Sequence, residues 1–349
     1  MRIIGCDLHS RQQTLAMLES ETGEVQECVL QHEGDEVRRF YAGLPGPVRV
    51  GIEATGSMQW FLELMEELGV ECLVGHPAKI RAHEPRKQKN DRRDALLLMN
   101  LLAEDRFPTI WMPSVEQRDV RALLRHRHQW VRMRVRIQNA LQSIALSHGL
   151  RRGAGLWSKD GQLSLLELKL PPHTEARRDE LMAMYRQMQA DIEGLDRIMA
   201  DTAEQRPRAR LLMTHPGVGP ITALATEVYL GDATRFADGK AVSSYVGMIP
   251  AEASSGGKRQ RLGKLTKQGN GMLRFLWCEC VRHAVRHDAE LKRFYTRKLA
   301  QKGLAKATVA TGRKLGIRLW IMLRDEVKYD EFCRRGRQCG EAHAERPAR

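Results

Sequence analysis

Paired cysteines and long apolar stretches are both missing from this sequence. The chain of 349 residues holds seven cysteines, which are odd in number, scattered and without a C-x-x-C pair. A disulfide framework and a cysteine zinc site are therefore not expected. No apolar stretch approaches the ~20 residues of a membrane-spanning helix, and the first residues favour a strand containing a charge over a signal peptide. These features predict a protein of the reducing cytoplasm with no membrane partner.

Acidic residues are scarce as well, but only in the later part of the chain. Residues 1–105 hold 12 Lys and Arg against 18 Asp and Glu, whereas residues 106–349 hold 45 against 25. The net charge of +14 comes from the later part, where clustered cations favour a polyanionic partner such as nucleic acid. Because 42% of the residues are apolar, the chain can bury more than one core, and we expect at least two domains.

The first hundred residues alternate between strand and helix patterns. Three strands follow one another, and helices then alternate with further strands. The expected strands are Arg2–Leu8, Thr14–Leu18, Val25–Gln31, Val48–Glu53 and Val70–Val74, and the expected helices are Glu36–Leu44, Met58–Leu68 and Asp91–Leu102. This order predicts an α/β domain with a mixed sheet.

Residues 114–205 have a helical period instead. Ser114 and Gln117 have the spacing of a capping box. Apolar residues then recur at heptad spacing, which predicts two helical arms of a coiled coil separated by a loop at 148–174. The heptad residues are Leu123, Trp130, Ile137 and Ile144 in the first arm, and Leu181, Tyr185, Met188, Ile192, Leu195 and Met199 in the second. A helical bundle inside one larger core is the alternative. The ending, Cys333–Arg349, is polar and basic, which predicts a frayed tail.

Five arginines of the first arm have the spacing of one helical face. They are Arg118, Arg121, Arg125, Arg132 and Arg136. Few acids are interleaved, and like charges on one face repel unless a polyanion is bound. We therefore predict that this face binds RNA or DNA, with an ordinary solvated face as the alternative.

Four acidic residues near the start of the chain are candidate metal ligands. Asp7 lies in the first expected strand and Glu53 at the end of the fourth, where a buried acid is costly unless a cation or hydrogen bonds compensate it. Asp91 and Asp94 share one face at the start of a helix. If the first and fourth strands are neighbours, the acids can converge on an oxygen-rich site for two Mg²⁺ or Mn²⁺ ions. A helix cap is the alternative role for Asp91 and Asp94.

A glycine-rich loop carries the second group of candidate residues. Ser254 and Ser255 stand beside Gly256 and Gly257, where a serine hydroxyl can be presented as a nucleophile without steric hindrance. Basic residues of this stretch could hold a phosphate beside it. They are Lys258, Arg259, Arg261, Lys264 and Lys267. The alternative is a phosphate-binding loop with ordinary turn serines.

Residues 215–223 read His-Pro-Gly-Val-Gly-Pro-Ile-Thr-Ala. A Gly-Val-Gly turn that opens a helix is typical of a helix-hairpin-helix, in which backbone N–H groups contact a DNA phosphate without reading bases. Gly217 and Gly219 are therefore candidate nucleic-acid-binding residues. Ordinary helix–helix packing is the alternative reading of the turn.

Taken in order, these motifs resemble the DEDD insertion-sequence transposases, the bridge-RNA-guided recombinases. The motifs are Gly-x-Asp, Ile-Glu-Ala-Thr-Gly, Asn-Asp-x-x-Asp-Ala, Pro-Gly-Val-Gly, and Gly-x-x-Pro followed by Ser-Gly-Gly-Lys. They cover about residues 3–325, in the order and spacing of the family. Asp7, Glu53, Asp91 and Asp94 fall on the four metal-binding acids of the family, and Ser255 falls on its nucleophilic serine.

The resemblance implies a RuvC-like, RNase H-fold domain at residues 1–112, a coiled-coil segment at 113–205 and a mostly helical C-terminal transposase domain at 206–330. Residues 331–349 would form a basic tail. It also implies donor and target DNA, a structured guide RNA, and a homo-oligomer, dimer or tetramer, in which acids and serine come from different protomers. A bacterial or archaeal cell, with the protein near the nucleoid, is the expected location.

The sequence departs from the family in one place. Many members carry an arginine and an aromatic residue between Gly-x-x-Pro and the serine, whereas this chain has Ala251, Glu252 and Ala253. Two other functions are alternatives to an RNA-guided recombinase. One is a metal-only RuvC-like resolvase of Holliday junctions, and the other is a non-catalytic protein that binds nucleic acid.

Overall fold

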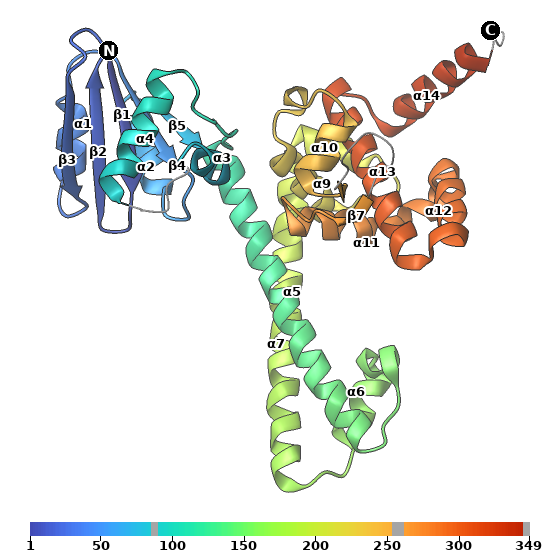
Figure 1. The fold of residues 1–349 in the computed structure, drawn as a ribbon. Helices are drawn as coiled ribbons and strands as arrows, with labels where there is room; N and C mark the ends of the chain where they lie inside the picture. The colour runs from blue at the N-terminus through green and yellow to red at the C-terminus, as the bar shows by residue number, and fades with distance from the viewer. Residues whose placement is uncertain (85–89, 253–261, 345–349) are drawn as a thin grey trace. The chain divides into compact units, whose positions relative to one another are not determined.

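The computed structural model describes residues 1–84, 90–252 and 262–344. The chain divides into two compact units, Met1–Met112 and Pro113–Arg349 (Figure 1). None of the helices in the described ranges has both the length and the apolar character to cross a membrane.

The first unit is built on a mixed five-stranded sheet in the order β3-β2-β1-β4-β5. The strands are β1 (Arg2–Leu8), β2 (Gln12–Glu19), β3 (Val25–Gln31), β4 (Val48–Glu53) and β5 (Glu71–Gly75), and the helices are α1 (Glu36–Ala42), α2 (Gln59–Glu67), α3 (Pro77–Ala82) and α4 (Asp91–Ala103). The first three strands form an antiparallel meander, and β1, β4 and β5 are parallel. The predicted α/β domain with a mixed sheet is confirmed. The short helix α3 was not predicted.

The two faces of β1 pack against different helices. Ile4 and Cys6 join a core with α1 and α2, whereas Ile3 packs against α4, and Figure 1 shows α4 lying across the opposite face from α1 and α2. Gly5 faces α4 too, and a Cβ there would lie only 2.1 Å from the backbone oxygen of Ala95. Only glycine permits this close approach, which brings the start of α4 to the end of β1.

Two long helices dominate the start of the second unit. They are α5 (Val115–Ser147) and α7 (Pro172–Gln205), and Ser114 and Gln117 form the predicted capping box. Arg127 of α5 binds Asp196 of α7 in a bidentate ion pair. Arg134, two turns later on α5, reaches back to Gln189. The two helices therefore run side by side in opposite directions. A short α6 (Lys159–Leu166) interrupts the predicted loop.

The interior along these two helices changes from one end to the other. Near the loop, Leu141, Met182 and Tyr185 form a small core with residues of α6. At the other end, Leu124 of α5 and Met199 of α7 belong to the large core of the C-terminal helices. The end near Leu124 and Met199 thus belongs to a larger helical core, as the alternative reading of the heptads expects, and the coiled coil stays a prediction.

The C-terminal part is helical with one short hairpin. Its elements are α8 (Pro207–Met213), α9 (Pro220–Leu230), α10 (Gly239–Val246), β6 (Pro250–Glu252), β7 (Leu262–Leu265), α11 (Gly271–His287), α12 (Ala289–Lys302), α13 (Leu304–Asp325) and α14 (Tyr329–Ala344). The ending was expected to be frayed from Cys333, and this was wrong because α14 runs through it to Ala344. The domain boundaries at 205/206 and 330/331 stay predictions.

Candidate active site

The strand pairing places two of the four acids at one edge of the sheet. β1 and β4 are parallel, with Cys6 opposite Ile52. Asp7 and Glu53 are the next residues of each strand, and side chains alternate between faces along a strand. Both acids therefore lie on the face that α4 covers. Asp7 is largely enclosed, since only 14% of its side chain is exposed.

The beginning of α4 supplies the other two acids. Asn90 is the N-cap and accepts a hydrogen bond from the backbone N–H of Arg92. The capping role considered for Asp91 and Asp94 is thus filled by Asn90. The Arg92 guanidinium forms an ion pair with Glu27 of β3, which fastens the first turn of α4 to the sheet.

Asp7 and Asp91 meet around a histidine. The Nε2 atom of His9 lies 3.1 Å from Asp7 Oδ2 and 3.4 Å from Asp91 Oδ2. Each of the three side chains offers a ligand atom within 4.8 Å of the others. His9 was missed in the sequence, although its position two residues after Asp7, just past the strand end, is a signal that could have found it.

The electrostatics of Asp7 reflect this convergence. Burial raises the pKa of its carboxyl group above the ordinary value, and the charges of Asp94 and Asp91 raise it further, while His9 opposes them. Asp94 therefore lies close enough to act on Asp7. Glu53 stands at the neighbouring strand end but is outside the 4.8 Å group found among the described residues.

This donor set suits a hard divalent cation. Carboxylate oxygens are the ligands that Mg²⁺ and Mn²⁺ prefer. Negative groups that converge while partly buried also gain most from a bound cation. The residues around Asp7 therefore fit a divalent metal, although they do not select one ion.

The loop with the candidate nucleophile falls outside the described residues. Ser254, Ser255, Lys258, Arg259 and Arg261 all lie in 253–261. The structure describes the hairpin on either side, in which Pro250 pairs with Leu265 and Glu252 with Leu262. Lys264 on β7 and Lys267 just after it are exposed, as a phosphate-binding role requires.

Two glycines hold the base of this hairpin together. A Cβ on Gly247 would lie 1.8 Å from the backbone oxygen of Gln268, and one on Gly269 would lie 2.1 Å from that of Tyr245. Both glycines have positive φ angles, 72° and 98°. Arg274 of α11 donates hydrogen bonds to the carbonyls of Val246, at 2.7 Å, and Gly269, at 3.2 Å. The two ends of the hairpin are therefore fixed to each other and to α11.

The Gly-Val-Gly turn connects α8 to α9, as the predicted helix-hairpin-helix requires. Gly217 has a φ of 90°, and a Cβ there would lie 2.5 Å from the backbone nitrogen of Ala284 on α11. Gly219 is exposed and is the N-cap of α9. Gly217 thus has a packing role, and Gly219 is the more accessible of the two to a phosphate.

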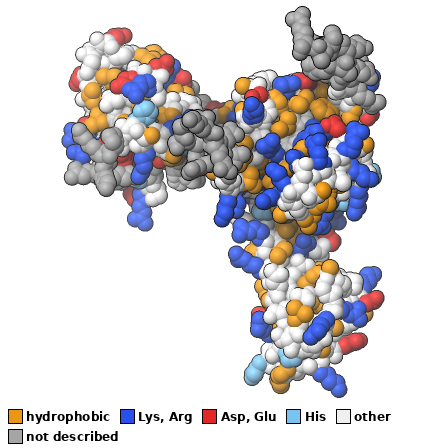
Figure 2. Space-filling view, turned by 45° about the vertical axis from the view of Figure 1, so that its right-hand side comes forward, with side chains coloured by type: hydrophobic (Ala, Val, Ile, Leu, Met, Phe, Trp, Pro, Cys, Tyr) orange, Lys and Arg blue, Asp and Glu red, His pale blue; other side chains and the backbone are white. Residues whose placement is uncertain are grey.

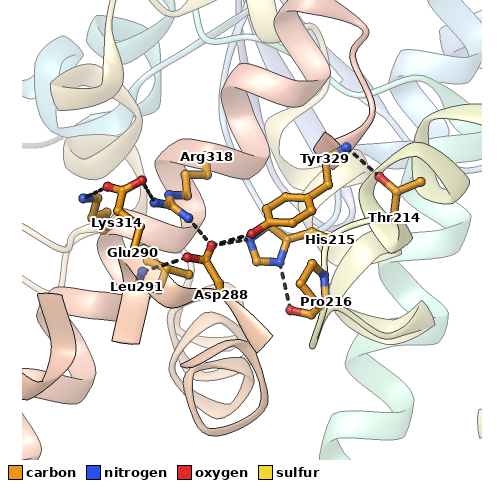
Figure 3. Close-up of polar contacts among 9 residues, drawn as sticks. All are labelled: Thr214, His215, Pro216, Asp288, Glu290, Leu291, Lys314, Arg318 and Tyr329. Carbon is orange, nitrogen blue, oxygen red and sulfur yellow. Dashed lines mark hydrogen bonds and ion pairs between the residues drawn. The ribbon is translucent and has the colours of Figure 1, made fainter. Parts of the chain in front are cut away.

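A buried polar network packs beside the residues that lead into the turn (Figure 3). Asp288 accepts hydrogen bonds from Arg318 and from the Tyr329 hydroxyl, the latter at 2.8 Å. The Tyr329 ring packs on His215, with the ring centroids 4.5 Å apart, and its backbone N–H donates to Thr214. Burial lowers the pKa of His215 to about 4, so this ring is neutral at pH 7. The start of α14 is thereby tied to the residues that lead into the turn.

The five arginines of α5 do not form a single exposed face. Arg121 donates to the carbonyl of Val228, at 2.9 Å from its Nε, and lies over the Tyr229 ring. Arg118 donates to the carbonyl of Pro113. These two guanidinium groups support the fold, so the expectation of a common face is corrected for them. A helical wheel gives the direction of a side chain but not what packs against it.

The remaining three arginines, Arg125, Arg132 and Arg136, are exposed. Figure 2 shows Lys and Arg side chains spread over the helical body of the second unit. This distribution agrees with the charge excess after residue 105, and we retain the three arginines as candidate contacts to a nucleic-acid backbone.

Replacing Arg125, Arg132 and Arg136 together with glutamine is expected to weaken nucleic-acid binding. Each phosphate that the protein no longer neutralises lowers the slope of log K against log salt by about 0.7–0.9. A salt titration of binding measures this slope. An unchanged slope would contradict the assignment. A matched control replaces three exposed arginines of α7, namely Arg177, Arg186 and Arg197.

Comparison with known proteins identifies the chain. A family model described as "Transposase", of the DEDD type, matches residues 4–148, and one described as "Transposase IS116/IS110/IS902 family" matches residues 209–296. The chain is 28% identical over 316 residues to a probable family 20 transposase of Pseudomonas aeruginosa, covering 86% of this chain and 91% of that protein. It is 26% identical over 304 residues to the transposase for insertion sequence element IS1111A of Coxiella burnetii, covering 84% and 83%.

A mixed sheet with converging acids and a basic helical unit together fit a DNA-processing enzyme. The chain belongs to the IS116/IS110/IS902 family of transposases. Transposases cut and rejoin DNA.

Proposed function

We propose that this protein is an insertion-sequence recombinase that exchanges DNA strands through a serine nucleophile, guided by a structured RNA. The observation that carries the proposal is the convergence of Asp7 and Asp91 around His9, with ligand atoms within 4.8 Å of one another. A cluster of this kind is expected of an enzyme that handles phosphate esters. A protein that only binds nucleic acid has no need of it.

The acids would serve as the metal-binding part of the site. Asp7 and Asp91 would be the principal ligands, Asp94 and Glu53 would complete the set, and His9 would be a ligand or would orient the carboxylates. Two bound Mg²⁺ or Mn²⁺ ions would supply Lewis acidity and stabilise charge on the phosphate oxygens. Because the pKa of Asp7 is raised, a cation and a proton would compete for it, and metal affinity would fall on acidification.

The serine would carry the strand during the exchange. The Ser255 oxygen would form a bond to phosphorus while one ester bond of the phosphodiester breaks, and the departing oxygen would gain a proton as the serine loses one. One ester replaces another, so the reverse reaction reseals the strand without an energy source. Lys264 and Lys267, with Lys258, Arg259 and Arg261, would neutralise the phosphate.

The partners follow the family resemblance. Donor and target DNA would both pair with the guide RNA, which leaves the sequence choice to base pairing. A homo-oligomer would bring the acids of one protomer to the serine of another. The exposed arginines of α5 and Gly219 would contact nucleic-acid backbones, and the enzyme would work in the cytoplasm.

Trapping a covalent adduct tests this proposal. The wild-type protein, incubated with labelled element DNA, guide RNA and Mg²⁺ and then denatured, is expected to retain label on the protein. Ser255→Ala is expected to remove the adduct, and Ser254→Ala is the matched control that keeps it. A cut strand with no adduct in the wild type would instead support a metal-only resolvase. Tight binding without cleavage would support a non-catalytic protein.

A further inference from the structure

A groove of about 430 Å³ opens in the second unit, separate from the acids of the first. Three segments form its walls, namely α5, the Gly-Val-Gly turn with the start of α9, and α11. Its volume lies in the range of about 300–1,000 Å³ that small-ligand sites occupy. The groove can therefore hold a group of the size of one nucleotide.

The α11 wall presents an aromatic ring beside a hydrogen-bond acceptor. Phe275, Glu279 and His283 are spaced by four residues and so share one helical face. Phe275 is 43% exposed, so part of its ring is open to a ligand. Its ring packs against that of His128, with the centroids 5.6 Å apart, so it is held in place at the groove.

The α5 wall contributes two arginines, of which Arg127 is already paired with Asp196. Arg127 is oriented by its bidentate pair with Asp196, at 2.6 and 3.2 Å. Arg134 donates from Nη1 to Gln189 at 2.8 Å, whereas its Nε is buried and has no hydrogen-bond partner in the part of the chain that the structure describes. An anion in the groove would approach this guanidinium.

The third wall adds backbone donors. Gly219 begins α9 and leaves its first turn without a side-chain cap, and Pro220 follows at the first helical position. The N–H groups of Ile221 and Thr222 lie in that turn, and both residues line the groove. Such N–H groups favour a phosphate, which complements the arginines of the opposite wall.

We propose that this groove binds one unpaired nucleotide of a DNA strand, with the base on Phe275 and its phosphate between Arg134 and the start of α9. The inference rests on the proposed function, since strand exchange requires DNA strands to separate. In a duplex, neighbouring bases cover the ring faces, so a stacking contact with Phe275 needs an unpaired base. Phosphate and arginine are complementary in charge.

Glu279 gives the groove a preference among bases. An ionised carboxylate can only accept hydrogen bonds, and cytosine, adenine and guanine all carry an exocyclic amino group that can donate one. Thymine has no amino group, and its single N–H lies between two carbonyl oxygens that a carboxylate repels. The groove is therefore expected to favour a base with an amino group over thymine at this position.

Binding of short oligonucleotides by the full-length protein tests the proposal in EDTA, where no cleavage is needed. Phe275→Ala is expected to weaken binding of single-stranded DNA about tenfold, the effect of losing one stacked base, and to leave duplex binding unchanged. A 2-aminopurine placed in the single strand loses fluorescence when it stacks on Phe275. Phe275→Ala is expected to restore this fluorescence. Glu279→Gln should remove the preference against thymine. Leu304→Ala, at an exposed apolar residue of α13, is the matched control.

Three results would overturn the proposal. Equal losses for single-stranded and duplex DNA would mean a general effect on the fold. Unchanged affinity of Phe275→Ala for single-stranded DNA would exclude the stacking contact. A loss confined to single-stranded RNA of the same sequence would assign the groove to the guide. Failure of the recombinase proposal would appear elsewhere, as a missing adduct in the wild type.

Discussion

Replacing Asp7 with asparagine is expected to lower the rate of DNA strand cleavage by about three orders of magnitude. Asp7 is the most enclosed of the clustered carboxylates and the one on which the charges of Asp94 and Asp91 act. Metal ions contribute several kcal/mol to stabilising charge in such reactions, and each ~1.4 kcal/mol is a factor of ten in rate. Asparagine keeps the shape of the side chain but removes its charge.

The same change is expected to leave the metal-free protein at least as stable as the wild type. Because the pKa of Asp7 is raised in the folded state, the folded protein binds this proton more tightly than the unfolded chain does. The stability that the group contributes is therefore greatest in acid and is lost as the pH rises through the raised pKa. At pH 7 the ionised carboxylate opposes folding, and asparagine relieves this.

Thermal unfolding with and without Mn²⁺, together with a cleavage assay in Mg²⁺, measures both effects. The wild type should gain stability from the metal, and Asp7→Asn should lose that gain along with its activity. Asp35→Asn, at an exposed acid that makes no capping hydrogen bond, is the matched control. Full cleavage by Asp7→Asn would exclude Asp7 as a ligand.

Replacing Asp288 with asparagine is expected to lower the free energy of unfolding by about 3 kcal/mol. Asp288 and Arg318 are 3% and 4% exposed, and removing one partner of a buried ion pair costs about 3–5 kcal/mol. The lower end is expected because Arg318 keeps Glu290 as a second partner, at 2.5 Å. The variant also weakens the attachment of Tyr329.

Chemical denaturation followed by circular dichroism measures this loss. Glu290→Gln is the matched control, because Glu290 is in the same network but 56% exposed, and its loss should cost less than about 1 kcal/mol. Equal costs for the two variants would contradict the assigned role of burial.

The network also sets a pH dependence. Burial lowers the pKa of His215 to about 4, so the unfolded chain takes up this proton first and stability falls as the pH drops from about 6.5 towards 4. Burial alone raises the pKa of Asp288, but the N–H of Leu291 and the charge of Arg318 outweigh it and hold the pKa below the ordinary value. Its contribution is present above the ordinary pKa and is lost in stronger acid.

Much of the first unit could be predicted because its strands and helices are local patterns. The end of β1 at Leu8 and the start of α4 at Asp91 are as predicted, and these positions bring Asp7 and Asp91 together. The position of His9 just past the strand end is a local signal, but its contact with Asp91 spans 82 positions of the chain and leaves no pattern in the sequence. Arg121 was misassigned for a related reason, since its hydrogen-bond partner Val228 lies in a helix far away in the sequence.

The glycine at position 5 has a further consequence. With no side chain between β1 and α4, the separation of strand and helix is set by main-chain atoms in contact. The core around them can exchange one apolar residue for another without changing how far apart the two carboxylates stand. The spacing between the two elements that carry Asp7 and Asp91 thus depends on the main chain and not on the size of a core side chain.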